Sequence, residues 1–375
     1  MLLLASVAIA ALAYWVLPAL QANAPPEEAV GAPDLMSLIG SLSEEGFEQP
    51  SPTWKLSLPE DHGVHSASRM ETWQLSTHLQ NEKGELSAFQ FSFLRLGVVP
   101  PSAPPPTSVW EVRELYRGHV TFTDAELDQA VGEERLARGM PRLAGYDADA
   151  GEIRLDNWFL RFGHDHASPE LNLYATVRDE AVVKLVMRPE KAAIASELEG
   201  NNAPFVGYSL TRMTVEGTVD RGHGEETVSG TAWLDHSWGD LPLPGVGPVA
   251  RDRLLFQLDD GTDFSVVRSR RTDGRGSPSM IAVVVAPDGT VSTFDDQNVE
   301  MTATRTWRHE ATGTEYPVAW RLEAPDLDIY IEPLIDAQIH NFSTPFWSGV
   351  VTLTGTRRDI SVSGTGTLLL TGYDQ

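Results

Sequence analysis

The 375-residue chain contains no cysteine. That absence excludes disulfide bonds, zinc sites built from thiolates and cysteine nucleophiles. Basic side chains are scarce too, since 28 Lys and Arg stand against 53 Asp and Glu, for a formal net charge of −25. Nucleic acids and anionic membrane surfaces are bound through clustered Lys and Arg, so this charge balance argues against both as partners.

Common catalytic motifs are missing as well. The chain has no Gly-x-Ser-x-Gly nucleophile elbow, no His-Glu-x-x-His metal motif and no glycine-rich phosphate loop. A secreted hydrolase is therefore the weakest functional interpretation, and we expect neither a cofactor nor a bound metal. What is present is 41% apolar residues, which is typical of a well-packed globular protein.

The amino end has the composition of an export signal. Residues 1–24 contain no charged side chain, and residues 2–20 are almost all apolar. Ala22-Asn23-Ala24 fits a signal peptidase site, although Pro25 follows it directly. The apolar run is also long enough to span a bilayer. We expect residues 1–24 to be either a cleaved signal peptide or an anchor that holds residues 2–20 in the inner membrane, with a periplasmic or extracellular body.

Residues 25–52 form a predicted linker rich in Pro, Glu, Gly and Ser. Within it, Asp34 is a good cap for one short helix, whose apolar residues are Leu35, Met36, Leu38, Ile39 and Leu42. We expect this helix to pack on the body that follows.

Beyond residue 52, apolar and polar side chains alternate with a period of two, which is typical of β-strands with one buried face. The first two such stretches are residues 73–80 and 89–94, joined by a turn through Asn81 and Gly84. Further strands are predicted over Glu152–Phe162, Leu171–Val177, Ala181–Met187 and Tyr208–Val219, with hairpins over 254–269, 281–294 and 349–372. Only Asp124–Arg138 has a pattern that predicts an α-helix.

So many antiparallel strands need closed or stacked sheets to protect their edges. One Pro/Gly-rich stretch, Asp240–Arg251, interrupts the pattern. We therefore predict an all-β fold with an N-terminal domain over residues 53–239 and a C-terminal domain over residues 240–375, each closed into a barrel.

Several motifs, in order along the chain, resemble those of the lipocalin-like carotenoid 1,2-hydratase/AttH family. Near the start, Asp61-His62-Gly63-Val64-His65 is followed by Arg69-Met70-Glu71-Thr72-Trp73. The strongest match is Val228–Gly239, VSGTAWLDHSWG, which is similar to Gly-x-Ala-Trp-x-Asp-His-x-Trp-Gly. Further matches are Phe89–Arg95, Tyr116–Asp124, Gly207–Arg212 and Gly364–Tyr373.

The resemblance spans residues 34–373 and implies two lipocalin-like antiparallel β-barrel domains with a pocket for an apolar ligand. The family includes carotenoid hydratases, related pericyclase-type enzymes and exported members with no assigned reaction. Because fold and function separate readily, the resemblance leaves the function open.

Asp235, His236 and Trp238 are the predicted catalytic residues. On a strand, His236 and Trp238 project to one face and Asp235 to the other. Hydration of an isoprenoid double bond needs an acid that protonates carbon, and an aromatic face steadies the tertiary cation that results. The resemblance to carotenoid hydratases implies these roles for His236 and Trp238. The alternative is a buried His–Trp pair that pins the domain junction.

One departure argues against hydration. Carotenoid hydratases carry a Tyr and an acidic residue on a strand shortly after this motif, where this chain has Phe264-Ser265-Val266-Val267-Arg268. The acid implied by the resemblance is therefore either missing or supplied from elsewhere in the chain.

Five residues are predicted to line the ligand pocket, and they are Glu71, Trp73, Tyr208, Arg212 and Trp233. Arg212 either binds a ligand carboxylate or pairs with Glu71 or Asp235, and the pairing is favoured.

Two short stretches carry the imidazoles and carboxylates that zinc or iron sites use. They are Asp61–His65 with Glu71, and His164-Asp165-His166. Residues two apart on a loop rarely suffice for a metal site, and short motifs often match by chance. Turn-forming and solvated roles are therefore favoured for both stretches.

These observations predict an exported, lipocalin-like protein that binds a hydrophobic small molecule, such as an isoprenoid or a lipid, in a barrel pocket. The alternative is a hydro-lyase of the carotenoid 1,2-hydratase type that adds water to an isoprenoid double bond. The export segment favours the carrier, and His236 with Trp238 keeps the enzyme open. The oligomeric state does not follow from the sequence.

Overall fold

The computed structural model describes residues 45–51, 53–108, 110–163, 170–198, 205–239 and 249–373. The export segment, the short helix after Asp34 and residues 240–248 of the domain boundary lie outside these ranges. The domain limits at residues 53–239 and 240–375 therefore stay predictions. Within the described residues, no helix has the length and apolar character needed to cross a membrane.

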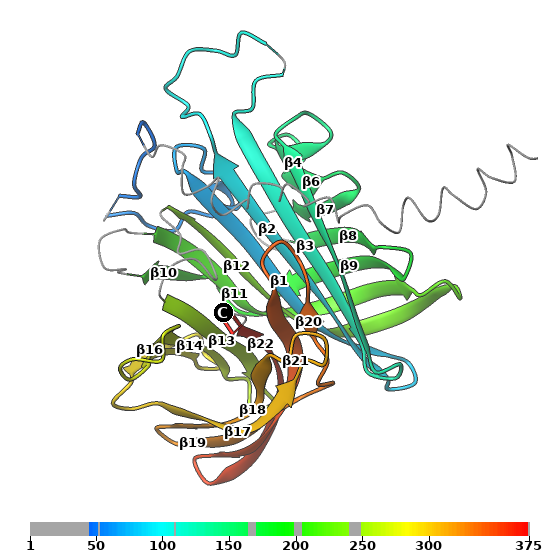
Figure 1. The fold of residues 1–375 in the computed structure, drawn as a ribbon, viewed down its shortest axis with the longest axis vertical. Helices are drawn as coiled ribbons and strands as arrows, with labels where there is room; N and C mark the ends of the chain where they lie inside the picture. Colours follow the sequence, from blue (N-terminus) through cyan, green and yellow to red (C-terminus); the bar gives the residue numbers. More distant parts are fainter. Residues whose placement is uncertain are drawn as a thin grey trace, which may run out of the picture. The chain divides into compact units, whose positions relative to one another are not determined.

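Strands make up nearly all the regular structure of these ranges, alongside one short 3-10 helix, η1 (Glu60–His62) (Figure 1). The first sheet is built from β1 (Met70–Asn81), β2 (Leu86–Gly97), β3 (Glu114–Asp124), β4 (Gln129–Arg138), β5 (Ala144–Asp147), β6 (Glu152–Leu155), β7 (Trp158–Phe162), β8 (Leu171–Val177), β9 (Ala181–Pro189), β10 (Ile194–Leu198), β11 (Phe205–Asp220) and β12 (Glu225–Gly239). The second sheet is built from β13 (Val249–Leu258), β14 (Asp263–Arg271), β15 (Ser279–Val285), β16 (Val291–Asp295), β17 (Glu300–Arg308), β18 (Glu315–Ala324), β19 (Leu327–Pro333), β20 (Ile339–His340), β21 (Phe346–Arg357) and β22 (Ile360–Leu370).

Both sheets are antiparallel. The first has the strand order β4-β3-β2-β1-β12-β11-β9-β8-β7-β6-β5, and β10 pairs with β11. The second has the order β16-β15-β14-β13-β22-β21-β19-β18-β17, and β20 pairs with β21. The register of β1 on β12 places Glu71 opposite Trp238 and Trp73 opposite His236, so these four side chains share one face of the first sheet.

The inner face of the first sheet carries a dense aromatic core. The side chains of Trp73, Phe91, Phe93 and Trp158 are at most 1% exposed. Burying each such side chain contributes about 1.5–3 kcal/mol, which holds the alternating strands in register. The second sheet has a core of its own, which includes a Phe256–Phe264 stack at 4.6 Å.

The first sheet curls until its edge strand β4 contacts β7 through side chains. The hydrogen-bonded order leaves β4 and β5 as edge strands. The Arg135 guanidinium on β4 lies 4.0 Å from the centre of the Trp158 ring on β7. Arg135 also donates to the Asn157 side chain at 2.5 Å. The sheet is therefore barrel-like, and side chains rather than a backbone ladder connect β4 to β7.

The predicted α-helix over Asp124–Arg138 is wrong, because this segment contains a β-turn followed by strand β4. The Asp124 carboxylate accepts hydrogen bonds from the backbone N–H groups of Glu126 at 3.0 Å and Leu127 at 3.3 Å. These bonds favour a turn, and pairing with β3 outweighs the helical propensity of the residues that follow.

The stretch Glu152–Phe162 is likewise not one strand but the hairpin β6–β7, which turns at Asp156 with a φ of 58°. An Asp-Asn pair tolerates this left-handed conformation. The turn could not be recognised in the sequence because apolar strand residues lie on both sides of it. The other predicted strands and the three predicted hairpins are confirmed.

The two sheets meet at a buried ion cluster around Asp263 on β14. Its carboxylate is 0% exposed. Lys191 Nζ lies 2.8 Å from one carboxylate oxygen and Arg212 Nη2, on β11, lies 2.7 Å from the other. The Thr211 hydroxyl donates to the same carboxylate at 2.8 Å. Charge pairing therefore links β11 of the first sheet to β14 of the second.

Substituting Asp263→Ala should lower the free energy of unfolding by about 3–5 kcal/mol, because two largely buried cations would lose their counter-charge. Urea denaturation followed by tryptophan fluorescence measures this loss. The control is Arg188→Ala, which breaks exposed pairs with Glu170 and Glu216 and should cost less than about 1 kcal/mol. Equal losses in the two variants would contradict a stabilising role for the cluster.

Candidate functional site

A group of polar side chains lies where β1, β11 and β12 meet the segment Asp61–His65. The segment is held by its own turn, since the Ser57 backbone N–H donates to the Asp61 carboxylate at 2.7 Å. It brings Asp61, His62 and His65 onto the face that carries Glu71 and His236.

Glu71 is the centre of this group and is 0% exposed. The His65 backbone N–H donates to both of its oxygens at 3.0 Å. His65 Nδ1 and His236 Nε2 each lie 2.8 Å from Oε1. Burial raises the pKa of Glu71, but the hydrogen bonds from His236 and His65 outweigh that effect and hold the pKa below its usual range. The carboxyl group is therefore ionised at neutral pH.

His65 contacts a carboxylate at each of its ring nitrogens. Nδ1 faces Glu71 at 2.8 Å, and Nε2 faces Asp61 Oδ1 at 3.1 Å. An imidazole donates from both nitrogens only when it is protonated, so this geometry suits an imidazolium ion. The ring stacks on Trp238 with centroids 3.5 Å apart and planes 4° from parallel. Its side chain is 22% exposed, which makes His65 the accessible member of the group.

His236 lies deeper and is 0% exposed. Its ring stacks on Trp73 at 4.4 Å, which fixes the direction of Nε2 toward Glu71. Burial lowers the pKa of His236, although Glu71 raises it, so the imidazole is neutral and donates its Nε2 proton to Glu71.

His62 and Tyr208 form a second buried pair beside His236. His62 Nδ1 lies 2.6 Å from the Tyr208 hydroxyl oxygen, and the His62 ring stacks on Phe162 at 4.7 Å. Burial, with a smaller effect of His236, lowers the pKa of His62 to about 4. Burial also raises the pKa of Tyr208 well above its usual value, so both groups are uncharged at neutral pH.

Arg95 connects this group to the surface of a cavity. The guanidinium is buried, lies 3.8 Å from a Glu71 oxygen and donates to Glu114 at 2.8 Å. It also donates to the backbone carbonyls of Ser68 at 3.0 Å and Ser66 at 3.2 Å. Arg95 therefore positions the chain just before β1 and supplies positive charge near Glu71.

The cavity has a volume of about 1030 Å³ and includes Val64, Tyr116, Met140 and Tyr146 in its lining. A Cβ atom placed on Gly63 would lie 3.7 Å from the Tyr146 ring, so this wall packs directly on the segment that carries His65. The pKa of Tyr146 is raised by burial and by the negative charge of Glu71. The cavity therefore borders the polar group.

The lining differs from the apolar pocket that the sequence led us to expect. It contains four acidic side chains and three arginines, namely Glu114, Asp147, Asp149, Glu152, Arg142, Arg154 and Arg161. The inner face of the sheet, where an apolar pocket was expected, is occupied by the aromatic core described above.

Three residues of the group could hold a metal ion. Ligand atoms of His65, Glu71 and His236 lie within 4.8 Å of one another, and two imidazoles with one carboxylate are a set that zinc and iron sites use. Each of these atoms already takes part in a hydrogen bond, so a metal ion would have to displace two ring protons. The stretch His164-Asp165-His166 lies outside the described residues.

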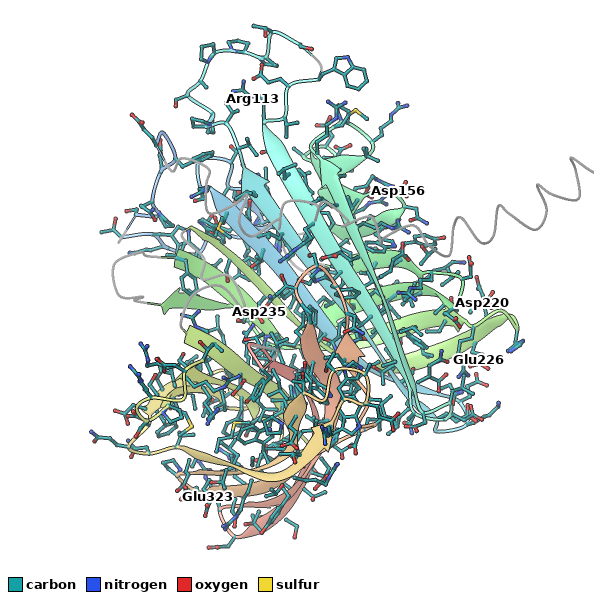
Figure 2. All side chains as sticks on the ribbon, in the orientation of Figure 1. Arg113, Asp156, Asp220, Glu226, Asp235 and Glu323 are labelled. Carbon is teal, nitrogen blue, oxygen red and sulfur yellow. The ribbon has the colours of Figure 1, made fainter. Side chains whose placement is uncertain are left out.

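The structure divides the predicted site residues between the two faces of β12. His236 and Trp238 lie with Glu71, Trp73 and Tyr208 in the polar group. Asp235, labelled in Figure 2, lies on the opposite face and pairs with Arg253 of β13 at 2.8 Å.

Two other predicted pocket residues also lie away from the group. The Trp233 indole N–H donates to Asp235 at 2.9 Å. Arg212 is paired, as favoured, but its partner is Asp263 and not Glu71 or Asp235. Asp235, Trp233 and Arg212 therefore belong to the contact between the sheets.

For the segment that contains His62 and His65, sequence reasoning favoured turn formation over a metal site. Their motif can be recognised in the sequence. His236, which shares the Glu71 carboxylate with His65, lies 171 positions after His65, and only the β1–β12 register brings the two together. Arg95 gave no signal beyond its place at the end of the motif Phe89–Arg95.

Comparisons with known proteins agree with this fold. A family model described as AttH-like matches residues 49–373. A solved structure from Nitrosomonas europaea, assigned as AttH, has a TM-score of 0.73 and 24% identity over 87% of this chain and 100% of its own. No curated protein matches the chain.

Two further solved structures share the fold at lower identity. Kievitone hydratase from Nectria haematococca has a TM-score of 0.63 and 14% identity over 88% of this chain and 97% of its own. CghA, solved with Sch210972, has a TM-score of 0.52 and 13% identity over 89% of this chain and 97% of its own.

The lowered pKa of His62 predicts a loss of stability in acid. Its pKa is about 4 in the folded chain, while an unfolded histidine titrates near pH 6.5. Between these values the unfolded state binds more protons, so the free energy of unfolding falls as the pH falls from about 6.5 to about 4. Substituting His62→Gln should flatten this dependence by on the order of 3 kcal/mol, measured by urea denaturation across that range.

The matched control is His223→Gln, since His223 is exposed in the turn between β11 and β12. Its pH dependence should equal that of the wild type. His78 and His340, whose pKa values burial also lowers to about 4, keep part of the slope in every variant. A slope in the His62 variant as steep as in the control would contradict the prediction.

Proposed function

The chain belongs to the AttH-like family over residues 49–373, and from this premise we propose that it is an exported hydro-lyase that adds water to a carbon–carbon double bond of a small molecule. The ligand would carry an isoprenoid-like hydrocarbon part. The amino-terminal apolar run supports export.

The observation that carries the proposal is the placement of His65 between Asp61 and Glu71. A partly exposed imidazolium beside a cavity is a proton donor, and alkene hydration begins with a proton. A protein that only carries a ligand needs no such donor. One similar structure is named a hydratase, but at 14% identity that likeness extends to the fold alone.

The proposed reaction has three steps. His65 transfers a ring proton to one alkene carbon, and the electron pair of the double bond forms the new C–H bond. The cation left on the other carbon is steadied by the Trp238 indole, whose ring lies against His65. Water then bonds to the cation and returns a proton to the neutral imidazole, so the net change is one water added.

Glu71 and His236 would act as positioning residues for this transfer. The Glu71 carboxylate holds the His65 ring in place through its contact with Nδ1 at 2.8 Å. His236 fixes the carboxylate by its Nε2 hydrogen bond, and Trp73 fixes the His236 ring. The chain supplies the acid from a segment before β1, not from the later strand where carotenoid hydratases carry it.

A carrier without turnover is the second candidate, as the sequence alone favoured. It is supported by the burial of Glu71 and His236, both 0% exposed, because a group so enclosed also serves to hold the segment Asp61–His65 on the sheet. The two candidates differ in whether a bound alkene is converted.

The test is a set of acyclic isoprenoid alkenes incubated with the protein in ¹⁸O-labelled water, with products identified by mass spectrometry. The wild type should form labelled alcohols. The variants His65→Gln, Glu71→Gln and His236→Ala should lower the rate by about a hundredfold or more, because they remove the acid or its orientation. Trp238→Phe should lower it less, since phenylalanine keeps a weaker aromatic face.

His223→Gln is the control and should retain full activity, because its side chain is exposed and remote from the cavity lining. Ligand retention is measured in parallel by extracting the purified proteins. A wild type that retains isoprenoids but yields no labelled alcohol would replace the hydro-lyase by the carrier. Turnover unchanged in His65→Gln would remove His65 from the mechanism.

A further inference from the structure

The charged side chains around the cavity are mostly paired with one another. Glu114 is bound by Arg95 at 2.8 Å. Glu152 is 3% exposed and forms ion pairs with two arginines of the lining, Arg154 at 2.5 Å and Arg161 at 2.6 Å. Glu114 and Arg95 neutralise each other, whereas Glu152 leaves one positive charge in excess. The guanidinium groups of Arg154 and Arg161 are nevertheless already hydrogen-bonded within the wall.

Arg142 is different. Arg142 is exposed and belongs to the cavity lining, and its guanidinium forms no hydrogen bond or ion pair with any residue that the structure describes. Asp147 is occupied as a turn residue, since its carboxylate accepts the backbone N–H groups of Asp149 at 3.0 Å and Ala150 at 3.1 Å. In the described part of the lining, the charged side chains without a partner are Arg142 and the exposed Asp149.

The backbone at Arg142 is also unusual. Its φ is 66°, in the left-handed region, at a turn closed by the bridge between Met140 and Ala144. A side chain with a Cβ atom disfavours this conformation, which six other non-glycine residues of the described ranges also adopt. The turn therefore places an unpaired arginine at the cavity at a conformational cost that a glycine would avoid.

A pure hydrocarbon is a poor match for this lining. A ligand that filled the cavity with carbon alone would cover part of the Arg142 guanidinium and offer it no hydrogen-bond acceptor in return, which disfavours binding. A ligand with one anionic group would instead supply two acceptors in the plane of the guanidinium. The lining therefore selects for a ligand that is polar at one end and apolar at the other.

We propose that the ligand is an amphipathic carboxylic acid whose carboxylate binds Arg142 and whose hydrocarbon part extends past Val64 and Tyr146 toward His65. The proposal rests on the proposed function for the reaction at the hydrocarbon part, but the binding of the acid stands independently of it. One unpaired arginine balances one negative charge, and Asp149 in the same lining repels more highly charged groups. A carboxylate is therefore favoured over a diphosphate.

The test is isothermal titration calorimetry of the full chain with three probes that share one hydrocarbon skeleton, namely farnesoic acid, farnesol and farnesyl diphosphate. The wild type should bind the acid about tenfold more tightly than the alcohol, because the acid adds a charge-assisted hydrogen-bonded pair. Arg142→Ala and Arg142→Gln should remove this difference while leaving the affinity for the alcohol unchanged.

Arg358→Ala is the matched control, because Arg358 is also an arginine in a turn with positive φ, 51°, but lies between β21 and β22 in the second sheet. It should bind like the wild type. Asp149→Asn should retain the preference for the acid and strengthen binding of the diphosphate.

Equal affinities for acid and alcohol in the wild type would overturn the proposal, as would a preference for the acid that survives in both Arg142 variants. A diphosphate that binds more tightly than the acid would also overturn it. Binding of the acid that depends on Arg142, with no hydrated product in labelled water, would support this proposal while rejecting the hydro-lyase. Hydrated products together with equal affinities for acid and alcohol would support the hydro-lyase while rejecting this proposal.

Discussion

The buried carboxylate of Glu71 is the constraint on which the site depends. A carboxylate that is 0% exposed is tolerated only when charged or polar donors replace the water it has lost. Here the donors come from three separate places, which are the His65 backbone and ring, the His236 ring and the nearby Arg95 guanidinium. The segment before β1 must therefore fold back over the sheet, and β12 must pair with β1 in one register. Losing either would leave the carboxylate without its donors.

The register of β12 also separates two kinds of polar chemistry. His236 and Trp238 face Glu71, while Asp235 and Trp233 face the second sheet. Because side chains alternate along a strand, a slip of one residue would exchange these sets and bury Asp235 against the aromatic core. The ion clusters between the sheets hold β11 and β12 from outside and so keep the inner face in place. Packing of the second sheet thus supports the group around Glu71, although no described residue of that sheet belongs to its hydrogen-bonded network.

The all-β fold could be predicted from the sequence because the alternation of apolar and polar residues along a strand is a local signal. The strands Leu171–Val177 and Ala181–Pro189 could be read almost to the residue, since each has one buried face. Sequence reasoning failed at Asp124–Arg138, where cross-strand pairing overrides local helical propensity. In the site it found His236 and Trp238 through their motif, but it could not join them to His65. That contact depends on a long-range register and on a turn in the segment Asp61–His65, neither of which any periodicity encodes.

The motifs that resemble the family cover the group around Glu71 but not the whole cavity wall. The group around Glu71 is built from the residues of the shared motifs, so the family likeness accounts for its presence. The cavity wall from Gly139 to Arg161 matches none of those motifs, yet it sets the charge that a ligand meets first. The same group around Glu71 can therefore occur beside cavity walls of different charge, because the group and the charged wall lie on different segments of one sheet. In this chain those segments are connected through Arg95, which contacts both Glu71 and Glu114, so a change in the wall can reach the donor by electrostatics without altering the backbone of either.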